Sequence, residues 1–268
     1  YGIRRAPRPY GMRRGARAGV SEIGKGNGGE VSRSGPFAGC PRAGTMPGMT
    51  AVRAEGLTKF YGARRGLEDL DLEVERGEVF GYLGPNGAGK TTTIRLLLDL
   101  IRPTRGRVRV LGGSPRDPAV RARIGYLPGD LRLEGDERAD RYLAFLGEMR
   151  GGVSRDRIRE LAERLDADLS VRMGRLSRGN RQKIGLIQAF MHDPELVILD
   201  EPSNGLDPLV QQEVHALVRQ VRAAGGTVLM SSHVLTEVEQ VADRVGIVRA
   251  GRLVAVEEIA ALRERAVR

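Results

Sequence analysis

The strongest chemical signal in the sequence is a glycine-rich run that ends in a lysine and a threonine. Its two outer glycines, the lysine and the threonine have the spacing of a phosphate-binding loop. The run follows the apolar stretch 79–83 and opens a segment of helical spacing at 90–101, which is the context this loop requires. We therefore predict that nucleotide phosphates bind to Gly84, Pro85, Asn86, Gly87, Ala88, Gly89, Lys90 and Thr91.

The backbone and the side chains of this loop have complementary roles. Glycines let consecutive N–H groups point inward, and the N-terminus of the next helix adds a partial positive charge. Lys90 is expected to reach the β- and γ-phosphates, and the Thr91 hydroxyl is expected to ligate Mg²⁺. Thr92 is expected to donate a hydrogen bond to the α-phosphate.

Two carboxylates follow a second apolar run. The run 196–199 is Leu-Val-Ile-Leu, and Asp200 and Glu201 come directly after it. Carboxylates at the carboxyl end of a strand lie at the ligand-binding edge of an open α/β sheet. Asp200 is expected to hold Mg²⁺, and Glu201 to polarise an attacking water. Together the two motifs predict a P-loop NTPase.

Strands alternate with helices from about residue 50, which favours a mainly parallel α/β sheet. Residues 70–74 alternate between apolar and acidic side chains, as a half-buried strand does. A charged stretch at 131–165 is the expected place for helices. Further strands are predicted at 79–83, 107–111, 124–127, 196–199, 228–230, 245–248 and 252–256, and helices at 90–101, 179–190, 209–223, 234–242 and the C-terminal end.

Composition narrows the class of protein. The chain has 268 residues, a formal net charge of +10 and one cysteine. Nine basic residues against two acidic ones lie in residues 1–45, where apolar periodicity is absent. Residues 1–48 are therefore predicted to be a disordered basic leader, and the alternative is a basic arm that touches nucleic acid or anionic lipid. No stretch approaches the ~20 apolar residues of a membrane span. An integral membrane protein and a disulfide scaffold are excluded.

The stretch 176–180 reads Leu-Ser-Arg-Gly-Asn and resembles the Leu-Ser-Gly-Gly-Gln signature of the ATP-binding cassette (ABC) family. The resemblance covers residues 50–256, with Arg178 and Asn180 as departures. Physically, Ser177 and the N–H groups of the next helix can form a second anion site. The resemblance implies that Ser177, Gly179 and Asn180 bind the γ-phosphate held by another subunit.

Three other segments carry the resemblance further. Gly-Leu-Asp at 205–207 is similar to the family's D-loop, which implies that Asp207 lies at a subunit interface. His233 follows a buried strand and resembles the switch histidine, which implies a catalytic contact with the γ-phosphate and the water. Tyr61 occupies the place of an aromatic residue that stacks on adenine. The alternative for Tyr61 is packing against the sheet.

Gly129 departs from the family pattern, which usually has a glutamine there. The sequence Pro-Gly-Asp at 128–130 predicts a tight turn with its own geometry. Two expectations follow: Gly129 adopts a positive φ, and Asp130 is able to turn inward in place of the missing amide.

The resemblance implies a P-loop NTPase of ABC type, with a parallel core sheet, an N-terminal antiparallel β portion and a helical subdomain at about 131–192, all within a domain at 49–268. It implies an ATPase that uses ATP and Mg²⁺ and forms a homodimer or heterodimer. It also implies a cytoplasmic location at the inner face of the cell membrane, where the subunit powers export through separate transmembrane permease subunits, as in ABC-2-type exporters. Nucleic acid is not expected as a partner.

Two alternatives remain at this point. A soluble ABC ATPase that acts on nucleic acid or ribosomes has the same motifs. A P-loop kinase or GTPase is the other alternative, but such an enzyme does not need the signature or His233.

Overall fold

The structure is a computed structural model, and it describes residues 49–266. The predicted leader, residues 1–48, lies outside the described residues. By their contacts the described residues fall within one compact unit, and the domain at 49–268 stays a prediction. Within 49–266, no helix has the length and apolar character needed to cross a membrane.

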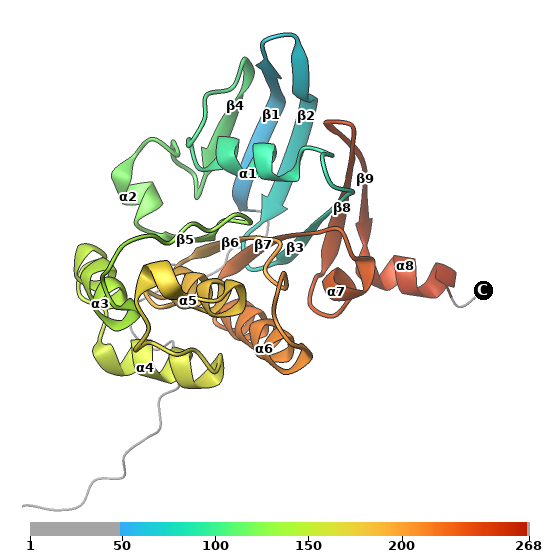
Figure 1. Cartoon of the computed structure of the whole chain (residues 1–268). Helices are drawn as coiled ribbons and strands as arrows, with labels where there is room; N and C mark the ends of the chain where they lie inside the picture. Colours follow the sequence, from blue (N-terminus) through green and yellow to red (C-terminus); the bar gives the residue numbers. More distant parts are fainter. Residues whose placement is uncertain (1–48, 267–268) are drawn as a thin grey trace, which may run out of the picture. The chain divides into compact units, whose positions relative to one another are not determined.

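The N-terminal antiparallel portion is a three-stranded sheet made of β1 (Thr50–Tyr61), β2 (Arg64–Glu75) and β4 (Arg105–Val110) (Figure 1). Its order is β2-β1-β4. The alternation predicted at 70–74 is confirmed, because Leu70, Leu72 and Val74 are buried while their neighbours Asp71 and Glu73 are exposed. This sheet therefore has one apolar face and one face in water.

The core sheet has six strands in the order β5-β6-β7-β3-β8-β9. All neighbours pair in parallel except β8 and β9. Because the carboxyl ends of parallel strands share one edge, the segments that follow β3, β6 and β7 meet there. The strands are β3 (Val79–Leu83), β5 (Ile124–Leu127), β6 (Leu196–Asp200), β7 (Thr227–Ser232), β8 (Arg244–Arg249) and β9 (Arg252–Glu258).

Helices cover both faces of the core sheet (Figure 1). The helix predicted over 90–101 ends early, since Leu98 is its C-cap and Asp99 has a φ of 55°. We propose that α3 to α5 make up the helical subdomain predicted at about 131–192. The helices are α1 (Lys90–Leu97), α2 (Pro118–Arg121), α3 (Ala139–Met149), α4 (Arg155–Arg164), a 3₁₀ turn (Met173–Arg175), α5 (Arg178–Phe190), α6 (Pro208–Ala223), α7 (Leu235–Glu239) and α8 (Ile259–Ala266).

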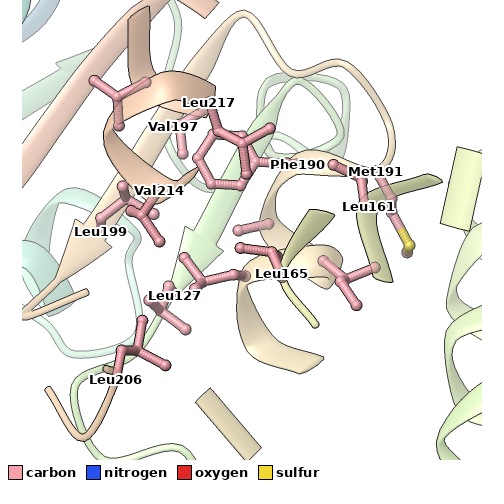
Figure 2. Close-up of a cluster of buried hydrophobic side chains, with 14 of the residues drawn as sticks. Leu127, Leu161, Leu165, Phe190, Met191, Val197, Leu199, Leu206, Val214 and Leu217 are labelled. Carbon is pink, nitrogen blue, oxygen red and sulfur yellow. The ribbon is translucent and has the colours of Figure 1, made fainter. Parts of the chain in front are cut away.

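The strand β6 is buried on both faces, which explains its continuous apolar sequence. Val197 and Leu199 pack with α4, α5 and α6 in the cluster drawn in Figure 2. Leu196 and Ile198 point to the opposite face, into the cluster that contains α1 and the three-stranded sheet. Asp200 ends this strand and is fully buried. The two clusters thus hold the carboxylate edge rigidly beside the phosphate loop.

Candidate functional site

The predicted phosphate loop lies between β3 and α1. A β-carbon at Gly84 would lie 2.4 Å from the carbonyl oxygen of Val248, so only glycine fits there. Gly89 has a φ of 114° and is the N-cap of α1, a backbone conformation that glycine adopts without strain. These two positions let the loop turn tightly at the start of the helix.

A hollow of about 560 Å³ lies at this loop. It brings together Tyr61 and most of the loop residues predicted to bind phosphate, with Gly84 and Ala88 outside its lining. Arg64, Arg65 and Gly66, the first three residues of β2, were not predicted from the sequence but line the same hollow. The complete lining is Tyr61, Arg64, Arg65, Gly66, Pro85, Asn86, Gly87, Gly89, Lys90, Thr91, Thr92 and Glu201.

Lys90 is the buried cation of this hollow, with 6% of its side chain exposed. Its Nζ donates a hydrogen bond to the carbonyl oxygen of Gly84 at 2.6 Å. The same Nζ forms an ion pair with Glu201 Oε1 at 3.0 Å. The ammonium group is thus already held at the end of the loop, next to the predicted catalytic carboxylate.

Asp200 is fixed by two hydroxyl groups. Thr91 Oγ1 donates to Asp200 Oδ2 at 2.8 Å, and Ser231 Oγ donates to Asp200 Oδ1 at 2.6 Å. Thr91 and Asp200, the two predicted metal ligands, are therefore in direct contact. A hydroxyl and a carboxylate in contact are hard oxygen donors of the kind that Mg²⁺ prefers.

Glu201 stands between two nitrogen-bearing side chains. Its Oε1 pairs with Lys90, and its Oε2 accepts a hydrogen bond from His233 Nδ1 at 2.7 Å. Its backbone has a φ of 53°, a left-handed conformation that costs a residue other than glycine about 1–3 kcal/mol. The surrounding hydrogen bonds must hold this conformation, and Glu201 is consequently presented to the hollow at the end of β6.

Tyr61 lies at the rim of the hollow, where 47% of the residue is exposed. A β-carbon at Gly66 would lie 2.9 Å from its ring, so glycine gives the ring room. Lys59 Nζ lies 5.3 Å from the ring centroid. The exposed ring on the lining of the same hollow is consistent with stacking on a base, which stays a prediction.

The predicted signature residues line a different hollow, of about 760 Å³. Ser177, Gly179, Asn180 and Asp207 all contribute to it, and none of its lining residues belongs to the hollow at the phosphate loop. Ser177 caps α5, because its Oγ accepts a hydrogen bond from the Asn180 N–H at 3.1 Å. One chain therefore keeps its two groups of predicted nucleotide contacts apart.

Asn180 and Asp207 have structural contacts of their own. The Asn180 amide donates to the carbonyl oxygen of Asp168 at 2.8 Å and accepts from its N–H at 3.0 Å. Asp207 caps α6, because Oδ1 accepts from the N–H groups of Leu209 and Val210, each at 3.1 Å. The pKa of this carboxyl is lowered below its usual value, mainly by the hydrogen bond from the Val210 N–H. Both residues thus order the loops beside the signature hollow.

Both expectations for the turn at Gly129 are wrong. Gly129 lies outside the positive-φ region. Asp130 does not turn inward, since its side chain is 72% exposed and pairs with Arg132 at 3.2 Å. A β-carbon at Gly129 would instead lie 3.2 Å from Oδ2 of Asp200. Close approach to a fixed, fully buried carboxylate is therefore what favours glycine here.

We expect Gly129→Gln and Gly129→Ala to slow the ATP hydrolysis that the resemblance implies roughly tenfold. Either β-carbon presses on Asp200, which its two hydroxyl partners hold in place, and overpacking of this kind costs about 1–3 kcal/mol. Steady-state ATPase assays over a series of Mg²⁺ concentrations measure the effect. A Gln variant faster than both wild type and the Ala variant contradicts the expectation, because an added amide would then help the site.

Two further residues of the site, Ser231 and Gln182, were not predicted either. Ser231 Oγ also accepts a hydrogen bond from the Glu201 N–H at 3.0 Å, so it joins Asp200 to Glu201. Its position two residues before His233 at the end of β7 was a usable signal. Gln182 bonds to carbonyl oxygens beside Glu201 from α5, and no local sequence pattern indicates such a contact.

Comparison with known proteins shows which proteins this chain is similar to. The profile of the ABC transporter family matches residues 67–204. The bacitracin transport ATP-binding protein BcrA of Bacillus licheniformis is 37% identical over 215 residues, covering 78% of this chain and 70% of that protein. The daunorubicin resistance ATP-binding protein DrrA3 of Streptomyces coeruleorubidus is 42% identical over 213 residues, covering 77% and 67%.

A solved structure of an ATP-binding subunit of an ABC transporter is also similar. It has a TM-score of 0.73 at 30% identity, and the match covers 81% of this chain and 94% of that chain. Together with the strand order, this confirms the predicted fold class, with its parallel core sheet and its antiparallel β portion.

Proposed function

Since this chain belongs to the ABC transporter family and is the ATP-binding, ATP-hydrolysing subunit of a transporter, we propose that it powers export of a drug or antibiotic through separate transmembrane permease subunits. The names of the relatives, bacitracin transport and daunorubicin resistance, support this class of cargo. The matches span about two thirds of the length of these relatives. The proposed place of the subunit is the cytoplasmic face of the cell membrane.

The separation of the two hollows carries the proposal that two subunits act together. The phosphate loop and the signature residues line hollows with no residue in common. We infer that a nucleotide at the loop of one subunit meets Ser177, Gly179 and Asn180 of a second subunit. We propose a dimer, of two copies or of one copy and a related chain, that holds two ATP molecules with each Asp207 near the interface.

Within one subunit, the loop residues provide the phosphate site. Gly87 has a φ of 79°, and a β-carbon there would have open space around it, so its backbone can approach a ligand closely. Lys90 offers its ammonium group, and Thr92 lines the hollow next to it. Tyr61 offers a flat, exposed ring for the adenine.

The residues present fit Mg²⁺. No group of three or more His, Cys, Asp or Glu side chains in residues 49–266 could hold a metal by itself. Mg²⁺ usually needs only one or two protein oxygens, together with phosphate oxygens and waters. Thr91 Oγ1 and Asp200 Oδ2 are such a pair. When bound, the ion neutralises charge on the phosphates.

For hydrolysis, Glu201 is the proposed general base and His233 its partner. Glu201 lines the hollow and is ionically paired, so its carboxylate can accept a proton from an attacking water. His233 Nδ1 holds Oε2 at 2.7 Å, which leaves the ring in position to orient groups beside the carboxylate. The resemblance to the switch histidine supports this role.

The relatives favour transport over the alternative of a soluble ABC ATPase that acts on nucleic acid or ribosomes, because their names describe antibiotic transport and drug resistance. A kinase or GTPase is likewise disfavoured by the match to the family profile.

Co-expression tests the transport proposal. We expect a multi-span membrane protein to be encoded beside this chain and to co-purify with it, and we expect the pair to raise the tolerance of a host cell to bacitracin or to daunorubicin. The same pair with Glu201→Gln should give no protection, because export depends on ATP turnover. ATPase activity that responds to nucleic acid and not to the membrane protein would contradict the proposal.

A further inference from the structure

The backbone of Glu201 is held from both sides. On its amide side, the N–H donates to Ser231 Oγ at 3.0 Å. On its carbonyl side, the oxygen accepts from the Asn204 N–H at 3.2 Å and from Gln182 Nε2 at 3.3 Å. Because Glu201 has a φ of 53°, this conformation persists only where the surroundings enforce it. Each of these contacts is therefore a candidate for control of the carboxylate's direction.

Gln182 is the side chain in this set that comes from another layer of the fold. It lies on α5, only 7% of it is exposed, and its Nε2 also donates to the carbonyl oxygen of Pro202 at 3.1 Å. One amide group thus bridges two consecutive carbonyl oxygens of the segment that contains Glu201. A buried amide with both donors engaged has a single defined orientation, so it can locate that segment.

The same helix begins at the signature residues. Its first turn packs on the segment after Glu201: a β-carbon at Gly179 would lie 3.1 Å from the carbonyl oxygen of Gly205, and Arg178 lies beside Gly205 as well. Contacts at 178–179 and at 182 therefore join α5 to residues 201–205. This is a direct path from the signature hollow to the predicted general base of the same chain.

We propose that Gln182 is a positioning residue for Glu201, which fixes the strained peptide at the end of β6 from the signature helix. The inference rests on the proposed role of Glu201 as general base. Gln182 itself touches neither the hollow at the phosphate loop nor any group expected to react. It acts through the direction in which the Glu201 side chain leaves the backbone.

The test is Gln182→Met, which keeps the length of the side chain and removes the donors. We expect kcat for ATP hydrolysis to fall about 10- to 100-fold, the size of effect that a small misplacement of a reacting group produces. The KM for ATP should change less than about twofold, because the phosphate loop is untouched. Gln182→Leu, which also lacks the donors, serves the same purpose if the Met variant does not fold.

Gln188→Met is the matched control on the same helix. Gln188 accepts a hydrogen bond from the Tyr142 hydroxyl at 3.1 Å, away from both hollows. It should lower the melting temperature comparably and leave kcat unchanged. Equal kcat losses for the two variants would show a purely structural role for Gln182 and overturn the proposal.

A double-mutant cycle with Glu201→Gln separates this inference from the proposed function. A residue that acts only through the Glu201 carboxylate has little left to act on in that background, so Gln182→Met should slow the remaining turnover less than about twofold. A full additive loss overturns the positioning role. If Glu201→Gln alone hydrolyses ATP normally, the proposed general base is wrong. If it is slow while Gln182→Met is normal, only the present inference fails.

Discussion

Lys90→Ala is expected to weaken ATP binding by about 100-fold or more. Lys90 is buried, points along the phosphate loop and donates to the carbonyl oxygen of Gly84. A positive charge facing phosphates in such a poorly hydrated place contributes about 3 kcal/mol or more. The substitution also leaves Glu201 without its ion-pair partner at 3.0 Å. An unpaired carboxylate next to the phosphates adds repulsion to the lost attraction.

Equilibrium binding of ATP measures this effect directly. Lys183→Ala is a suitable control, because Lys183 pairs with Asp166 at 3.2 Å and lines the other hollow. It should leave binding to the isolated subunit unchanged. Wild-type affinity in Lys90→Ala would mean that the loop is not the phosphate site.

Glu201→Gln is expected to slow ATP hydrolysis by roughly 10²–10⁴ while ATP binds at least as tightly as in the wild type. Gln keeps the shape of Glu but lacks the basic oxygen. It also releases Lys90 from its ion pair with Oε1, so the ammonium group is freer to bind phosphate. The variant should therefore accumulate as an ATP-bound dimer.

Single-turnover assays and size-exclusion chromatography with ATP test both parts. Glu213→Gln, on α6 and paired with Arg164 at 3.3 Å, removes one carboxylate charge outside both hollows and should behave as wild type. Normal hydrolysis by Glu201→Gln places the base elsewhere. A slow variant that stays monomeric with ATP argues against the two-subunit site.

The sequence alone determined the features that depend on neighbours along the chain. The spacing within 84–91 sets a tight turn and a helix start, which are local backbone events. The apolar run 196–199, followed by two carboxylates, likewise predicts a strand without knowledge of the strands it pairs with. A strand that is buried on both faces is apolar throughout. The alternation at 70–74 predicted its strand for the same reason.

Only the tertiary structure decided which separate segments meet. The strand predicted near 107–111 joined the antiparallel sheet as β4, since pairing is chosen by packing between distant segments. The positive φ expected at Gly129 was wrong, because the obstacle that favours glycine there, Asp200, lies far along the chain. Ser231 and Gln182 went unnoticed because their bonds to the segment 200–202 span some 20 to 30 residues. Contacts between such distant segments form when the two apolar clusters pack around the core sheet, and the spacing of residues along the chain does not encode them.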